Sequence, residues 1–227
     1  MRNKEIRQLM TRNYLVLSLL LVITACNNSG SDTSTADSTG KEAPIPTDSP
    51  ATAVPSIAKI PDSLLLDRTI EITTVLDKKD YTRLADFFHP TEGVRFTPYG
   101  YIDTAHDIKF TKDQFLTQLK NKSKQRWGSY DGSGDPINLT VEDYFKKFVY
   151  DVRFLYPEKL SLNKTLGLGN SLDNLPLVYP GSSYTESYFS GFDKKYGGLD
   201  WRSLKLVFKQ QGEQVYLVGV IHGQWTI

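Results

Sequence analysis

The C-terminal residues 201–226 read WRSLKLVFKQQGEQVYLVGVIHGQWT and contain the clearest strand pattern in the chain. Leu204, Leu206 and Phe208 recur at every second position, and residues 215–220 show the same alternation. Gly212 lies in the short turn between the two runs. A period of two on both sides of a glycine-containing turn is typical of an antiparallel β-hairpin. We therefore expect two long, paired strands at the end of this sequence.

The preceding segments predict several helices and further strands. Residues 63–77 place apolar side chains near one helical stripe, directly after the start signal formed by residues 61–63. Thr111 and Thr140 are each followed three residues later by Gln or Asp, a spacing that favours a helix N-terminus. The other expected elements are a short helix over 81–88 that Pro90 ends, and strands over 94–102, 108–111, 125–130 and 183–190.

This order of elements indicates the fold class. Helices come first, and a mostly antiparallel sheet follows, which is typical of an α+β domain. Residues 56–227 are numerous enough to bury one sizeable core. We therefore expect a single α+β domain over residues 56–227.

Two segments of this domain carry a resemblance to a known superfamily. Residues 80–103 (DYTRLADFFHPTEGVRFTPYGYID) and residues 203–227, which end in VIHGQWTI, resemble the NTF2-like (cystatin-like) cone. The same HP..GVRF and HGQWTI ends are similar to those of uncharacterised bacterial lipoproteins. The resemblance implies a curved antiparallel sheet whose concave face is packed by helices and often encloses a pocket.

The resemblance also suggests which side chains could line such a pocket, since its enzymes use a buried Asp or Tyr against an apolar wall. The position of His222 stays open: if Leu217 and Gly219 face the core, then regular alternation turns His222 to the opposite side. His222 is then either a pocket residue or a structural histidine. The candidate pocket residues are Arg95, Tyr99, Trp127, Asp151, His222 and Trp225.

The N-terminus has the features of an export signal. Four basic side chains within residues 1–12 precede the apolar run YLVLSLLLVI at 14–23, which is too short to span a bilayer. Residues 23–26 (ITAC) resemble the lipobox of bacterial lipoproteins, which implies a signal peptide over 1–25 and lipid attachment at Cys26. Because Cys26 is the only cysteine of the chain, it has no internal disulfide partner. An ordinary secretory signal with an incidental cysteine is the alternative.

Residues 26–55 are expected to form a flexible linker behind the lipid. Residues 27–55 contain no aromatic side chain and many Ser and Thr, so they cannot bury enough apolar surface to order themselves. A flexible chain of this length reaches about 30 Å on average. The sequence therefore predicts an extracytoplasmic domain in the cell envelope, tethered to a membrane through Cys26.

Charge and motifs exclude several functions. With 27 basic and 26 acidic side chains, the chain lacks the basic excess typical of nucleic-acid binders. No catalytic motif, metal-site spacing or cofactor motif stands out, so we expect neither a metal nor a cofactor. Residues 131–142 place oxygen ligands at the spacing of a calcium loop, but Pro136 replaces the required glycine, which favours a simple turn.

Two functions fit these observations. The first is a lipid-anchored binding module for a small molecule, a glycan or a protein partner. The alternative is an NTF2-like pocket enzyme of the isomerase or hydrolase type that uses a buried Asp or His. We prefer binding, because no acid and base occur at motif spacing.

Overall fold

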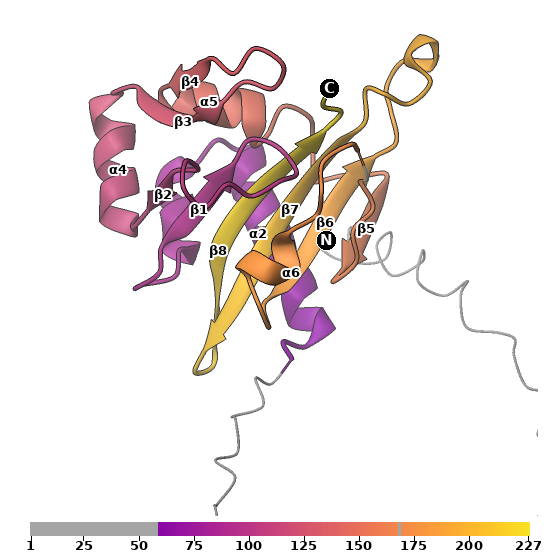
Figure 1. The fold of residues 1–227 in the computed structure, drawn as a ribbon. Coiled ribbons are helices and arrows are strands. Elements are labelled where there is room, and N and C mark those ends of the chain that lie inside the picture. Colours follow the sequence, from indigo (N-terminus) through magenta and orange to yellow (C-terminus); the bar gives the residue numbers. More distant parts are fainter. Residues whose placement is uncertain (1–58, 168) are drawn as a thin grey trace, which may run out of the picture. The chain divides into compact units, whose positions relative to one another are not determined.

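The computed structural model describes residues 59–167 and 169–227, and a six-stranded sheet lies at their centre (Figure 1). The strand order is β2-β1-β8-β7-β6-β5. Neighbouring strands pair antiparallel except β1 and β8, which run parallel. The strands are β1 Val94–Thr97, β2 Lys109–Phe110, β5 Lys159–Leu162, β6 Ser183–Phe189, β7 Arg202–Gln211 and β8 Gln214–Gln224.

The predicted C-terminal hairpin is confirmed as β7 and β8, with one irregularity that changes which side chains share a face. Val207 lies opposite Gly219, but Phe208 lies opposite Leu217, so Val218 is an extra residue. One extra residue reverses the alternation of the strand. His222 therefore lies on the same face as Leu217, and the regular alternation expected from the sequence is wrong at this point.

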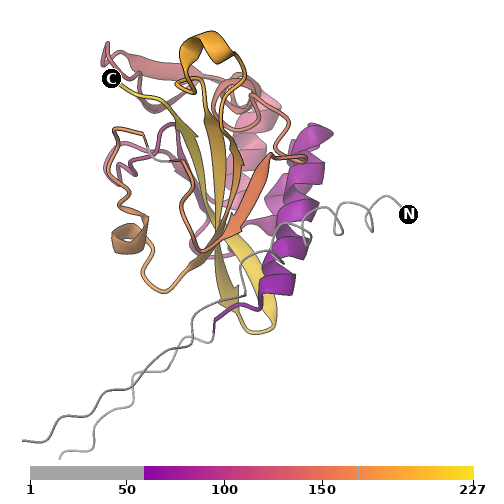
Figure 2. The same ribbon diagram turned by 90° about the vertical axis from the view of Figure 1, so that its right-hand side faces the viewer.

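Helices cover one face of the sheet, and Figure 2 shows α2 on that side. Thr111 accepts a hydrogen bond from the Gln114 amide, and the Thr111 amide donates one to Oε1 of Gln114, while Thr140 accepts one from the Asp143 amide. Both predicted N-caps are thus confirmed. The helices on this side are α2 Asp62–Asp77, α3 Tyr81–Leu84 with the 3-10 turn Ala85–Phe87, α4 Lys112–Asn121 and α5 Val141–Phe148.

Aromatic rings fill the space between these helices and the sheet. Trp127 stacks on Tyr144 with ring centroids 3.9 Å apart, and Phe96 on β1 contacts both rings edge-on. Phe115 of α4 and Phe145 of α5 complete the cluster. The α+β class and the helix-covered sheet agree with the NTF2-like resemblance, whereas the space where that resemblance implies a pocket is occupied by packed rings.

A small second sheet lies beside the helices. The predicted strand at 125–130 is β3 Gln125–Ser129, and it pairs with β4 Pro136–Leu139, which the sequence did not predict. Between them the Asp135 carbonyl accepts a hydrogen bond from the Tyr130 amide, and Asp131 accepts one from the Ile227 amide. These contacts agree with the turn interpretation of residues 131–135.

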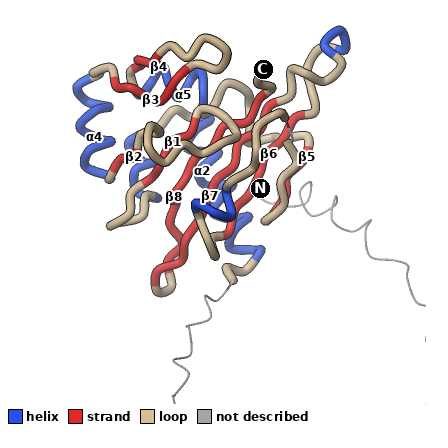
Figure 3. The backbone as a smooth tube through the Cα atoms, viewed as in Figure 1, coloured by secondary structure: helices blue, strands red, loops and turns tan. Residues whose placement is uncertain are grey.

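Loops and a single short helix cover the opposite face of the main sheet. These are residues 98–108, which follow β1, and residues 163–167 and 169–182, which include α6 Leu175–Val178. Figure 3 shows that most of this cover is loop rather than helix. The predicted strand over 94–102 ends at Thr97, and the chain leaves the sheet at Pro98.

The N-terminal predictions lie outside the described residues. These are the signal peptide over 1–25, lipidated Cys26 and the linker over 26–55. Within the described part, no helix is sufficiently long and apolar to cross a membrane.

Candidate functional site

A cleft of about 400 Å³ lies where β1 and β8 end. Because these two strands are parallel, the residues that follow each of them meet at the same edge of the sheet. Residues 98–107 after β1 form one wall, and Thr226 after β8 forms another. The end of β3 and Ser171 complete the lining.

The loop after β1 is held in place through its backbone. Arg95 donates hydrogen bonds to the carbonyl oxygens of Thr104 and Asp107, at 3.2 and 3.0 Å. Asn174 accepts from the Ile102 amide and donates to the Ile102 carbonyl, both at 2.9 Å. These contacts fix the wall of the cleft before any ligand arrives, which lowers the entropic cost of binding.

Asp107 is the most unusual group in the cleft. Only 9% of the residue is exposed, and its Oδ2 accepts hydrogen bonds from Thr97 Oγ1 at 2.6 Å and from the Asp103 amide at 3.0 Å. Burial raises the pKa of the carboxyl to about 6, although these hydrogen bonds and the charge of Arg95 oppose the shift. Asp107 can therefore gain or lose a proton near neutral pH.

The second carboxylate oxygen of Asp107, Oδ1, lies on the side of Gly128. The hydrogen bonds from Thr97 and the Asp103 amide both go to Oδ2, and Oδ1 lies beside Gly128, another lining residue. A Cβ atom at Gly128 would be 3.8 Å from Oδ1. The glycine thus leaves room for a ligand atom next to this oxygen.

Tyrosines form the apolar part of the cleft. Tyr99 packs edge-on against Phe148, and its hydroxyl accepts a hydrogen bond from the Asp131 amide at 3.1 Å. Tyr101 is 52% exposed at the rim. Tyr144 is fully buried, and its hydroxyl has no hydrogen-bond partner within the described part of the chain. Burial raises the pKa of Tyr144 well above its usual value, and charges on Asp107 and Tyr99 add to the shift.

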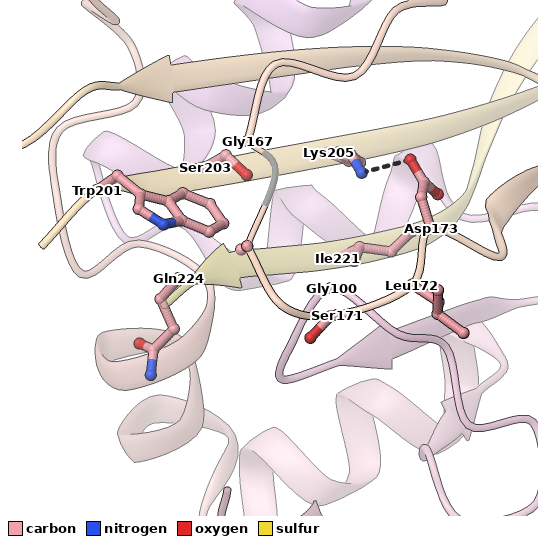
Figure 4. Close-up of a pocket in the computed structure, with 12 residues that line it drawn as sticks. Gly100, Gly167, Ser171, Leu172, Asp173, Trp201, Ser203, Lys205, Ile221 and Gln224 are labelled. Atoms are coloured by element: carbon pink, nitrogen blue, oxygen red, sulfur yellow. Dashed lines mark hydrogen bonds and ion pairs between the residues drawn. The ribbon is translucent and has the colours of Figure 1, made fainter. Parts of the chain in front are cut away.

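A much smaller cavity of about 20 Å³ lies next to the cleft and shares Ser171 with it (Figure 4). Lys205, 5% exposed, donates to Asp173 Oδ2 at 3.1 Å. Glu186, 0% exposed, accepts hydrogen bonds from the amides of Leu166 and Gly167. Burial raises the pKa of Glu186, and the charge of Lys205 opposes that shift. A cavity of this size holds about one water molecule, so these charges form a structural network.

Asp151 and His222 are brought together on the helix-covered side. His222, 0% exposed, contacts Asp151 Oδ1 through Nε2 at 3.1 Å and the Pro98 carbonyl through Nδ1 at 3.3 Å. Arg202 donates to the other oxygen of Asp151 at 2.8 Å. Burial alone would raise the pKa of Asp151, but His222 and Arg202 hold it below its usual value. The network anchors Pro98, where the cleft wall begins.

The structure does not gather the six predicted pocket residues into one site. Tyr99 lines the cleft, and Arg95 supports its wall from behind. Asp151 and His222 form their own pair, while Trp127 is buried in the ring cluster and Trp225 is partly exposed. The six residues lie apart because packed aromatic rings fill the space between the helices and the sheet, where the pocket was expected.

The sequence did not predict Asp107 as a site residue. It follows His106 in a polar turn, and nothing in that local pattern marks it as buried. Its burial comes from Thr97 on β1 and Gly128 on β3, which only the tertiary fold brings near. Among the described residues, no group of three or more His, Cys, Asp and Glu side chains could hold a metal ion.

Comparisons with known proteins are sparse. No family model matches the sequence, and no curated protein matches it. Among solved structures, the chain is similar to one described as a calcium/calmodulin dependent protein kinase II association domain from Xanthomonas campestris. The identity is 12%, the TM-score is 0.29, and the match covers 71% of this chain and 84% of that one. A TM-score this low does not assign a fold, so the fold class rests on the helices and strands described above.

Proposed function

We propose that this protein is a lipid-anchored binding module of the cell envelope that holds a small polar ligand in the cleft at the end of β1 and β8. The observation that carries the proposal is Asp107, a buried carboxyl that lines a cleft of about 400 Å³ and whose Oδ1 lies beside Gly128. That volume suits a small molecule. The lipobox-like residues 23–26 support the anchor.

Binding is favoured over catalysis by the partners of Asp107. Its Oδ2 contacts a threonine hydroxyl and a backbone amide, and neither is a general base or acid. The loop around it is fixed, as a preorganised binding wall requires. The ligand is then recognised by the carboxyl group of Asp107, two tyrosine rings and several hydroxyl groups.

An enzyme that uses the same cleft is the second candidate. A carboxyl whose pKa is about 6 is suited to proton transfer near neutral pH. In that case Asp107 would move a proton on a substrate held against Tyr99. This candidate is the pocket enzyme with a buried Asp that the sequence suggested as the alternative, but with its pocket at the edge of the sheet and not on the helix-covered side.

The anchor is tested by Cys26→Ala. Without the sulfur that receives the lipid, the protein should move from the membrane to the soluble fraction on cell fractionation. Asn27→Ala, which leaves the cysteine in place, is the matched control and should stay with the membrane. Retention of Cys26→Ala in the membrane fraction would contradict the anchor.

The cleft is tested by native mass spectrometry of the full-length protein purified from its own host in non-ionic detergent. We expect a small molecule to copurify with the wild type and with Asp113→Asn, whose exposed side chain lies on α4. Tyr101→Ala and Asp107→Asn should reduce its occupancy. Equal occupancy in all four proteins would place the ligand elsewhere. Turnover of a bound compound that stops in Asp107→Asn would favour the enzyme.

A further inference from the structure

The cleft has an excess of negative charge. Its lining includes the carboxyl groups of Asp103, Asp107 and Asp131, whereas Arg126 is the guanidinium that lines it. His106 at the rim is hydrogen-bonded to Asp103 at 2.7 Å. An anionic ligand would be repelled from this lining, so the choice lies between a neutral and a cationic ligand.

Asp107 has no ion-pair partner among the described residues. Arg95 on β1 uses its guanidinium for the carbonyl oxygens of Thr104 and Asp107. Lys205 on the same face of the sheet pairs with Asp173. The charged and titratable groups that surround Asp107 are Arg95 on β1, Asp103 and His106 in the loop, Arg126 on β3, Tyr144 on α5 and Tyr179 after α6.

A buried carboxylate of this kind is costly unless a cation approaches it. Oδ1 is the oxygen that a cation could reach, because Oδ2 is used by Thr97 and Asp103. Tyr99 and Tyr101 line the same cleft, and tyrosine faces attract ammonium groups. The carboxylate and the rings thus favour the same kind of ligand atom.

We infer that the ligand of this cleft carries a protonated amine, which pairs with Oδ1 of Asp107 and lies against the rings of Tyr99 and Tyr101. The inference rests on the proposed binding function and names the chemical class of its ligand. The apolar part of the ligand would contact the exposed ring of Tyr101 at the rim.

The two kinds of ligand differ in whether binding releases a proton from Asp107 or adds one to it. An ammonium group beside Asp107 favours the carboxylate, so binding releases a proton and affinity rises with pH. A neutral ligand only removes water from the carboxyl, so binding takes up a proton and affinity falls as pH rises. Because the pKa of Asp107 is about 6, the ammonium ligand should bind about tenfold more tightly at pH 7 than at pH 5.

The test is an NMR titration of the full-length chain, labelled with nitrogen-15, in non-ionic detergent at constant ionic strength. The probes are phenethylamine, its neutral counterpart 2-phenylethanol, N-acetylglucosamine and inorganic phosphate. We expect phenethylamine to shift the amides of Asp107 and Gly128 saturably, with the stated pH dependence. His106→Gln removes the rim imidazole and should keep that dependence, and Asp113→Asn should bind like the wild type.

Two variants complete the test. Asp107→Asn should abolish phenethylamine binding, and Tyr101→Ala should weaken it about two- to fivefold. Tyr101 is exposed, so this variant and the pH titration of the wild type test the inference even if Asp107→Asn does not fold.

Retained binding in Asp107→Asn, or equal binding of 2-phenylethanol, would overturn the inference. Binding of N-acetylglucosamine or phosphate alone would overturn it and leave the binding function intact. No response to any probe would count against both.

Discussion

The two faces of the main sheet bury different chemistry although the same strands form both. On β1, Phe96 points toward the helices, and its neighbour Arg95 points to the other side. On β7, Leu206 faces the helices, and Lys205 faces the loops with 5% of its surface exposed. Both sides exclude water, but the helix-covered side is apolar apart from the pair of His222 and Asp151, whereas the loop-covered side holds several buried charges.

The difference follows from what covers each face. A helix uses its backbone N–H and C=O groups internally, so it offers a sheet only side chains. A loop has free backbone groups, which can satisfy buried charges. Glu186 accepts from two loop amides, and Arg95 donates to two loop carbonyls. The loop-covered side can therefore hold a carboxyl such as Asp107, and the helix-covered side stabilises the fold.

The largest effect is expected on the helix-covered side. Phe96→Ala removes a fully buried ring that contacts the rings of six neighbours, so the free energy of unfolding should fall by about 4–5 kcal/mol. Urea denaturation of the full-length chain measures this change. Phe192→Ala removes a ring that is 54% exposed and should cost less than about 1 kcal/mol. Similar losses in the two variants would contradict the assignment of the core to this side.

On the loop-covered side, Lys205→Met should cost about 3 kcal/mol at pH 7, because it removes the positive charge that acts on the buried Glu186 and also breaks the ion pair with Asp173. The pKa of Glu186 in the folded state is already raised by burial and should rise further, so the loss grows as pH rises through that value. Adding Glu186→Gln should restore most of the stability in urea denaturation. Lys195→Met breaks an exposed pair with Asp193 and should cost less than about 0.5 kcal/mol. Equal losses for the two lysine variants would show that Glu186 does not need Lys205.

The fold could be predicted where a local pattern decides the structure. The hairpin of β7 and β8 and the N-caps at Thr111 and Thr140 depend on a few neighbouring residues of chain, and all were confirmed. The bulge at Val218 was not predicted, because an extra residue is defined only against the partner strand. β4 and β5 were missed for the same reason: each is four residues long and is stabilised by its neighbour.

The candidate site could be predicted less well. Tyr99 was named as a pocket residue, and it lines the cleft. Asp151 and His222 were both named, but only the fold shows that they contact each other across residues far apart in the sequence. Asp107 could not be identified, because its burial depends on Thr97 and Gly128, which lie on two strands from other parts of the chain. The resemblance to a cone implied a pocket on the helix-covered side, where packed rings fill the space.

The smallest effect is expected at Asp107 on the loop-covered side, and it is a change in how stability depends on pH. The pKa of its carboxyl is about 6 in the folded state and 3.8 in its unperturbed state. A raised folded pKa stabilises the protein fully below the unfolded value, and this contribution is lost as pH rises through about 6. The wild type should therefore lose about 2 kcal/mol between pH 4 and pH 8 that Asp107→Asn does not lose. Urea denaturation across this range measures the difference, with Asp113→Asn, an exposed carboxyl on α4, as the control. If the curves of Asp107→Asn and the wild type run parallel, Asp107 is solvated like Asp113, and the loop-covered side does not bury its charge.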